Sequence, residues 1–206
     1  MKTTTKALLV ALCALLLVVG TVSITVAYLT SEDSVTNTFT VGKVAIVLDE
    51  ADVKTDGSYE TDVNARVDAN VYHLIPGHEY IKDPVIHVDE KSEDCWIFIK
   101  LENGLKDIIG DVTIEAQLEA AGWELIDEAN CIYAYGEYAS AGDDVDTFKT
   151  FKIKGEAVLH DKDGNALYSA ETPIKVTAYA VQKDAFDTAA SAWAATFGVP
   201  EETTAG

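Results

Sequence analysis

The clearest strand signal in the chain is Ile174-Lys-Val-Thr-Ala-Tyr-Ala-Val-Gln182, in which apolar and polar side chains alternate. Successive side chains of a strand point to opposite faces, so a period of two residues is typical of a strand with one buried face. This stretch therefore predicts a long β-strand. Its inward face would carry Ile174, Val176, Ala178 and Ala180.

Shorter strand signals recur along the chain, separated by turn-forming residues. We expect strands at 39–48, 71–75, 84–88, 123–126, 131–135, 148–153, 156–160 and 166–169. Residues 96–101 are apolar on both faces except at Lys100, which predicts a central strand that is buried. The turn chemistry of Asp161-Lys-Asp-Gly-Asn165 predicts a hairpin between 156–160 and 166–169.

The first of these strands changes its apolar parity at Gly42-Lys43. One extra residue at that point returns both halves of the strand to the same face, so we expect a β-bulge there. The inward residues would be Phe39, Val41, Val44, Ile46 and Leu48. The next segment, Asp49 to Asn70, is acidic and has no apolar period, and it predicts a long loop or a weak hairpin.

Two short helices are expected. The first spans 111–121, with Asp111 as its N-cap and Gly122 at its end. The second spans 184–196, where Phe186, Ala190 and Trp193 recur at helical spacing. Many short strands with so few helices indicate an all-β fold, an antiparallel sandwich. A jelly roll is the preferred version, and an immunoglobulin-like sandwich is the alternative.

The beginning of the chain has the organisation of an export signal. Lys2 and Lys6 precede an apolar run, and small residues gather at Thr25-Val26-Ala27. We expect a hydrophobic signal helix in 1–27, cleavage between Ala27 and Tyr28, one domain over 28–200 and a flexible tail over 201–206. The competing interpretation is a retained membrane anchor, because roughly 20 apolar residues can span a bilayer.

The charge of the chain is strongly negative. It has 15 basic and 35 acidic residues, and removing 1–27 takes away two basic residues, which changes the formal net charge from −20 to −22. Such a field repels phosphate, so nucleic acid is excluded as an expected partner, and the same field favours solubility outside the cell.

No catalytic or metal-binding pattern stands out. The four histidines, His73, His78, His87 and His160, lack the His-Glu-x-x-His spacing of zinc proteases. Asp161, Asp163 and Asn165 begin like a calcium loop, but the pattern fails at Ala166 and Thr172. We therefore expect neither an enzyme nor a cofactor. Weak calcium binding by the acidic loops and a disulfide between Cys95 and Cys131 both stay open.

Several stretches together resemble the exported TasA/camelysin family of Gram-positive bacteria. They run in family order along nearly the whole chain: 20–30, Thr36-Asn-Thr-Phe-Thr-Val-Gly-Lys-Val44, Leu74-Ile-Pro-Gly77, Lys82-Asp-Pro84, Ser92-Glu-Asp-Cys-Trp96, Gly122-Trp123, Thr177-Ala-Tyr-Ala-Val-Gln182, Phe186 and Ala192-Trp193.

The resemblance implies a jelly-roll subunit of extracellular biofilm-matrix fibres, or a relative displayed at the cell surface, whose signal is cut by a SipW-type signal peptidase. It implies that the partners are other copies of the chain, joined head to tail, and other matrix proteins. The leading segment, Tyr28 to Leu48, would donate a strand to the next subunit through the inward residues given above. The alternative is that this strand pairs within its own chain.

The sequence leaves two rival functions open. Camelysin-like relatives have been classed as cell-surface metalloproteases, although the histidine spacing here does not favour that activity. A surface adhesin that never polymerises is the third hypothesis.

Overall fold

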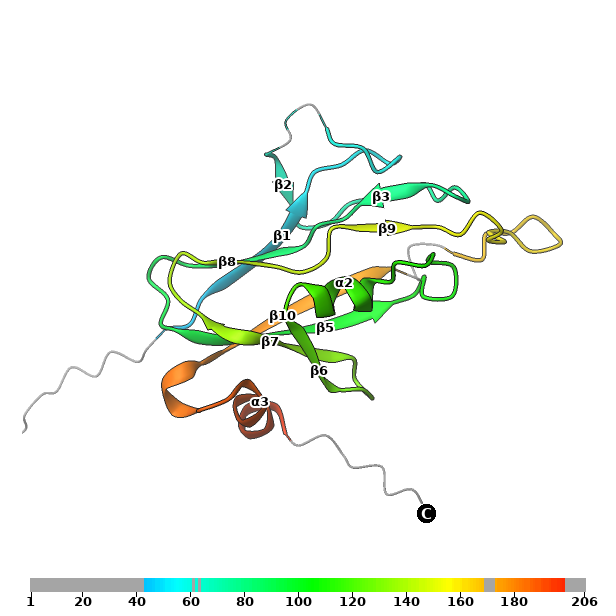
Figure 1. Cartoon of the computed structure of the whole chain (residues 1–206). Coiled ribbons are helices and arrows are strands. Elements are labelled where there is room, and N and C mark those ends of the chain that lie inside the picture. The colour runs from blue at the N-terminus through cyan, green and yellow to red at the C-terminus, as the bar shows by residue number, and fades with distance from the viewer. Residues whose placement is uncertain (1–42, 61, 63, 169–172, 199–206) are drawn as a thin grey trace, which may run out of the picture. The chain divides into compact units, whose positions relative to one another are not determined.

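Residues 43–60, 62, 64–168 and 173–198 are described by the computed structural model of the chain (Figure 1). The expected signal helix in 1–27 with its cleavage position at Ala27 and Tyr28, the residues Phe39 and Val41, and the tail 201–206 all lie outside this part. Within the described part no helix is long and apolar enough to cross a bilayer.

The described strands form two four-stranded sheets and a two-stranded ribbon, with antiparallel pairing throughout. The first sheet has the order β2 (Arg66–Val67), β1 (Ile46–Ala51), β4 (Val85–Val88), β8 (Asp144–Asp146). The second has the order β10 (Ile174–Gln182), β5 (Cys95–Asn103), β7 (Ile132–Ala139), β6 (Trp123–Asp127). The ribbon pairs β3 (Glu79–Ile81) with β9 (Thr150–Lys152).

The main core lies between the two sheets. Ile86 and Val88 of β4 and Val145 of β8 belong to the same buried cluster as Ile97 and Ile99 of β5. The ribbon and the helix α2 (Ile114–Ala120) add further buried side chains to this cluster. The predictions of an all-β fold and of antiparallel sheets are therefore confirmed.

The two strongest sequence signals become neighbouring strands. β10 has the predicted bounds, and all nine of its residues pair with β5. β5 is buried on both faces because Ile97 and Ile99 face the main core, while Phe98 faces a second cluster beneath the helix α3 (Ala189–Phe197). The expected central strand is thus confirmed.

Both helices begin later than predicted. Thr113, and not Asp111, caps α2, since its hydroxyl accepts the Ala116 N–H at 3.1 Å. Thr188 caps α3 in a capping box with Ser191, and a 3₁₀ turn, η1 (Lys183–Ala185), stands where the helix was expected to start. The predicted end of α2 is correct: Gly122 follows with a φ of 90°, a conformation that favours glycine.

Three expected strands do not form among the described residues: 71–75, 156–160 and the described part of 166–169. Residues 71–75 are irregular because the side chain of Tyr80 takes up their backbone groups: its hydroxyl donates to the His73 carbonyl and accepts the Ile75 N–H, both at 2.7 Å. Between 156–160 and 166–168 only one bridge forms, His160 to Ala166. The turn itself is correct, since the Asp161 carboxylate accepts the N–H groups of Asp163 and Asn165.

The region around β1 agrees with the predicted parity. Val44, Ile46 and Leu48 pack against the main core, while Val47 is 58% exposed. Gly42 lies outside the described residues, so the β-bulge remains a prediction. The segment Asp49 to Asn70 is the weak hairpin of the two alternatives, since β2 pairs with the end of β1.

Candidate functional site

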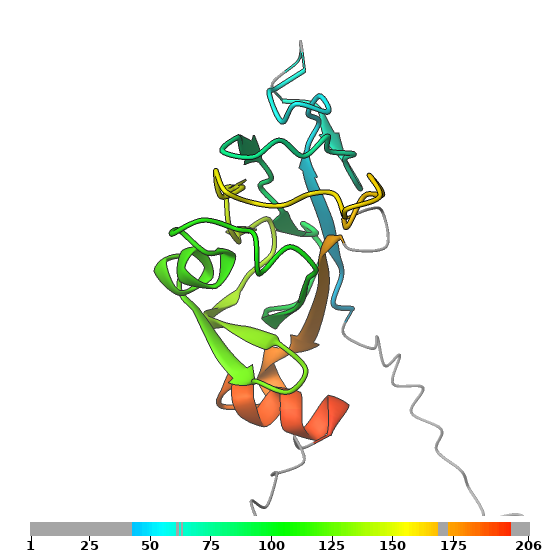
Figure 2. The same ribbon diagram turned by 90° about the vertical axis from the view of Figure 1, so that its right-hand side faces the viewer.

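β1 and β10 lie side by side along one side of the sandwich (Figure 2), and along this line the described residues leave part of the core uncovered. No backbone hydrogen bond joins these two strands in the described part of the chain. Along this line six apolar side chains face the main core and are only partly buried, three at or just before the beginning of β1 and three on β10, whereas Ile174 at the beginning of β10 is buried. We call this set the open seam: Val44, Ile46, Leu48, Val176, Ala178 and Ala180.

The contrast with the strands behind the seam shows that the partial burial is local. The inward residues of β4 and β5 are almost inaccessible, with Ile86, Ile97 and Ile99 at 0% exposure. Seam residues of the same inward parity keep part of their surface exposed to solvent. On β10 the inward side chains are also small at Ala178 and Ala180. The seam therefore has the length and the apolar character that suit an additional strand.

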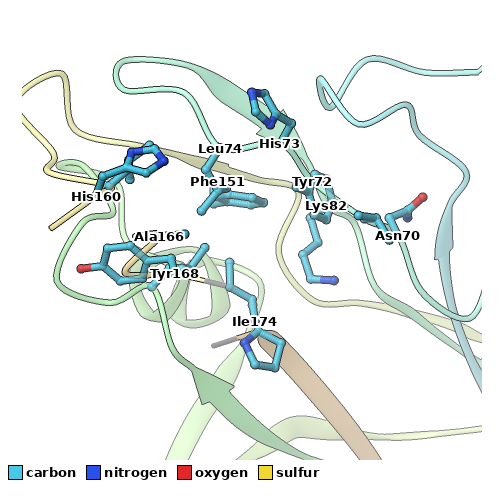
Figure 3. A pocket seen from close by; sticks show the side chains of 14 residues that line it. Asn70, Tyr72, His73, Leu74, Lys82, Phe151, His160, Ala166, Tyr168 and Ile174 are labelled. Carbon is cyan, nitrogen blue, oxygen red and sulfur yellow. The ribbon is translucent and has the colours of Figure 1, made fainter. Parts of the chain in front are cut away.

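At one end the open seam leads into a groove of about 460 Å³, shown in Figure 3. Ile174, the first residue of β10, lies in its wall, and Phe151 of β9 lies opposite. The remaining apolar lining comes from irregular segments: Val71, Tyr72, Leu74, Leu105, Leu159, Ala166, Tyr168 and Pro173. The groove is thus mainly apolar, with Asn70, His73, Lys82 and His160 supplying its polar groups.

Exposed apolar side chains lie on the segments that form the groove. Val71 is 77% exposed and Ile75 44% exposed on one segment, and Val158 and Leu167 are 66% and 49% exposed on the facing one. Val71 itself lines the groove, and the other three lie on segments that contribute to its lining. Single exposed apolar residues are ordinary, but several on the segments around one apolar groove are typical of a contact surface. We therefore regard the open seam and this groove together as the candidate functional site.

Charged side chains fix the end of β1 that lies nearest the groove. The Arg66 guanidinium donates to the Asp49 carboxylate at 2.6 Å and to the Asp83 carboxylate at 3.2 Å. Asp83 also accepts the Ala51 N–H at 2.8 Å. Burial opposes ionisation of Asp49, but its hydrogen bonds to Arg66 and His87 outweigh this and lower its pKa. These contacts, which we call the β1 clamp, hold Asp49 to Ala51 in the chain's own sheet.

His87 links three strands on the outer face of the first sheet. Its Nδ1 lies 2.5 Å from the Asp144 carboxylate of β8, and its Nε2 lies 3.0 Å from that of Asp49 on β1. Burial disfavours the imidazolium, but the two carboxylates more than compensate, so the pKa of His87 is raised. Protonated His87 therefore holds β1 and β8 to β4.

The other residues that the sequence singled out lie apart from one another. His78 contacts the Asp56 carbonyl at 2.7 Å, and His73 and His160 lie at the groove. Among the described residues no cluster of three or more potential ligands is arranged to hold a metal. Cys95 is buried and Cys131 exposed, and both are free thiols, which answers the question of a disulfide. Cys95 begins β5, and Cys131 lies beside the other end of this strand, where its carbonyl accepts the Leu101 N–H.

Some of the expected donor residues belong to the described part of the chain and some do not. Val44, Ile46 and Leu48 lie in the open seam, and Ile46 and Leu48 pair with β4 of their own chain. Phe39 and Val41 lie outside the described residues. Sequence reasoning missed the groove and the β1 clamp, since both arise where distant segments meet. A usable signal was the surplus of apolar residues in 71–75 and 156–168.

Comparisons with family models, with curated proteins and with solved structures found no match. The likeness to the TasA/camelysin proteins therefore rests on the sequence motifs alone.

Proposed function

We propose that this chain is an exported structural subunit that assembles head to tail into extracellular fibres, as its likeness to the TasA/camelysin proteins implies. In each joint, the leading segment of one copy covers the open seam and enters the groove of the next copy. The observation that carries the proposal is the partial burial of six inward apolar side chains along two strands that do not pair.

An added strand suits this site for two physical reasons. Among the described strands β5 is the one hydrogen-bonded neighbour of β10, so the other edge of β10 has no partner in this part of the chain and offers its backbone groups to a new strand. Alternate side chains of that strand would cover the core-facing residues of the open seam, and each buried methylene contributes about 0.8 kcal/mol. Because a head-to-tail contact does not close, its repetition gives a filament.

The β1 clamp narrows the part of the leading segment that can be donated. Asp49 to Ala51 are tied to Arg66 and Asp83, and Ile46 to Asp49 pair with β4. Removing them from their own sheet would break this pairing and separate the ion pairs. The Lys43 carbonyl also accepts the Glu93 N–H of the same chain. We therefore assign donation to 28–42, with Phe39 and Val41 as the inserted side chains, while Val44, Ile46 and Leu48 remain in their own chain and form part of the acceptor.

The finer features of the proposal follow the family likeness. The sandwich is a jelly roll. In the described part, the connections β4–β5 and β7–β8 each run from one sheet to the other. A SipW-type peptidase releases the mature chain at Ala27-Tyr28, and the product resides in the extracellular matrix or at the cell surface. Its partners are further copies of itself and other matrix proteins.

A matched pair of substitutions tests the acceptor. Val71→Asp places a carboxylate at the groove where the residue is 77% exposed in the single chain, and Val112→Asp makes the same change at a 64% exposed residue outside the groove. Both variants should fold normally. Burying a valine contributes about 1.5–3 kcal/mol, so Val71→Asp should weaken association by roughly tenfold or more, since 1.4 kcal/mol is a factor of ten. Val112→Asp should assemble like the wild type.

A mixing experiment tests the head-to-tail arrangement. Near the lowest concentration at which the wild type assembles, Val41→Asp should disable the donor and Val71→Asp the acceptor, so neither variant alone should form fibres by electron microscopy. Their mixture should give dimers by light scattering, because one good donor meets one good acceptor, and no fibres. Fibres from Val41→Asp alone would refute strand donation. A wild type that stays monomeric would favour the adhesin, and chelator-sensitive cleavage of casein with stoichiometric zinc would favour the metalloprotease.

A further inference from the structure

Three side chains beneath β1 form a nearly buried polar cluster. Glu50 belongs to β1, Asn70 follows β2 and Lys82 follows β3. The side chains of Glu50 and Lys82 are 5% and 11% exposed. The clamp formed by Arg66 already fixes the end of β1, so this second ionic contact requires an explanation of its own.

The carboxylate of Glu50 holds the other two groups on its two oxygens. Oε2 accepts from Nζ of Lys82 at 2.5 Å, and Oε1 accepts from Nδ2 of Asn70 at 2.9 Å. The carbonyl oxygen of the Asn70 amide accepts the backbone N–H of Val53 at 3.0 Å. An amine and a carboxamide are thus held next to one proton-accepting group, and a fixed N–H points at the carboxamide oxygen.

The surroundings of the cluster are aromatic. Tyr72 packs edge-on against Tyr80 and Phe151, with ring centroids 5.7 and 5.3 Å apart. Nζ of Lys82 lies 5.9 Å from the centre of the Tyr72 ring, and Figure 3 shows Lys82, Tyr72 and Asn70 together. Burial, helped by the charges of Glu50 and Asp83, raises the pKa of Tyr72 well above its ordinary value. With these aromatic neighbours and with side chains only 5% and 11% exposed, Glu50 and Lys82 are poorly solvated.

We propose that Lys82 and Asn70 join through an isopeptide bond in the folded protein, with Glu50 as the proton carrier. Glu50 first takes a proton from the Lys82 ammonium, which leaves a neutral amine. A torsional change of the lysine side chain brings Nζ onto Cγ of Asn70, and the new N–C bond forms as the carbonyl π electrons move to Oδ1. Glu50 then delivers its proton to Nδ2, the Cγ–Nδ2 bond breaks, and ammonia leaves and carries away the remaining amine proton. No oxidant or co-reactant is required.

Each neighbouring group has a defined part in this reaction. The N–H of Val53 stabilises the negative charge that develops on Oδ1, as an oxyanion-hole donor does. Holding the amine and the amide on one carboxylate replaces a bimolecular encounter, and well-oriented groups reach effective molarities of about 10⁵ M or more. The low exposure of the Lys82 side chain, 11%, limits the access of water to the amine.

The bond would fix one wall of the groove. It closes the segment from Asn70 to Lys82, which contains Tyr72 and Leu74 of the groove lining and the irregular stretch that Tyr80 holds. A covalent link across the base of this segment would keep it in place when a neighbouring chain is pulled.

Intact mass spectrometry of the full chain tests the proposal, with the N-terminus determined so that the calculated mass is certain. The folded wild type should be lighter than calculated by one ammonia molecule. Glu50→Gln and Lys82→Arg should show the calculated mass, and their near-UV circular dichroism should establish that they are folded. Lys149→Arg is the matched control, since Lys149 also pairs with a carboxylate, that of Asp146, but is exposed, and it should keep the deficit.

Trypsin should locate the bond. Acylated Lys82 is not a cleavage site, so the wild type should give Val67 to Lys91 as one peptide that lacks ammonia. A folded wild type with the calculated mass overturns the proposal, and so does a deficit that persists in Lys82→Arg, which would indicate a cyclic imide at Asn70. Loss of one water instead would place the bond on Glu50 and would overturn the assignment to Asn70.

Discussion

The placement of β1 can be tested by introducing aspartate at two adjacent residues. Leu48 packs against the main core from the open seam, whereas Val47 is 58% exposed on the opposite face. Complete burial of a leucine side chain stabilises the folded state by about 1.5–3 kcal/mol, and Leu48→Asp loses part of this free energy. The new carboxylate at a partly apolar site costs about 1–3 kcal/mol more. Val47→Asp should change the stability by no more than about 0.5 kcal/mol, as exposed substitutions do.

The expected destabilisation by Leu48→Asp is therefore about 2–4 kcal/mol, which corresponds to a lowering of Tm by roughly 4–16 °C for a domain of this size. Urea unfolding of monomeric protein measures it, and an unchanged slope with a lower midpoint would identify a pure stability effect. Equal effects of the two substitutions would mean that β1 does not pair within its own chain. A larger effect at Val47 would mean that the strand is shifted by one residue.

Three further predictions follow from individual side chains. Because His87 has a raised pKa when folded, its contribution to stability is complete below the unfolded value of about 6.5 and is lost as the pH rises through the folded value, so the stability difference between the wild type and His87→Gln should shrink above neutral pH. Burial raises the pKa of Cys95 to about 11, so native mature protein should react with a thiol reagent at Cys131 alone and at both cysteines after unfolding. Gly57→Ala should destabilise by about 2 kcal/mol or more in thermal unfolding, because φ is 78° and the new Cβ would lie 2.8 Å from a Cα of β3.

Local patterns in the sequence predicted those elements whose signal lies within their own residues. β10 and β5 follow from alternation and from a doubly apolar run, because burial of a strand leaves its period in the sequence. The turn at Asp161 follows from side-chain bonds that span only a few residues. Both predictions needed no knowledge of distant segments.

The errors arose where a distant or neighbouring side chain decided the outcome. Residues 71–75 have a strand-like pattern, but the Tyr80 hydroxyl takes up two of their backbone groups. The choice between Asp111 and Thr113 as a helix cap depended on which oxygen reaches a free N–H, and both residue types are good caps. The groove could not be predicted, because its walls come from segments as far apart as Tyr72 and Ile174.

The two ends of β1 have different surroundings, and this gives the proposed assembly a direction. The chain enters β1 near Glu93, whose N–H bonds the Lys43 carbonyl, whereas the groove lies at the other end, beside Glu50 and its partners. A growing polymer would therefore be polar, with a vacant acceptor at one tip and an unused leader at the other. A copy that lacks its leader could occupy only one of these tips, so a small amount of it would arrest elongation from that side and leave the opposite side free to grow.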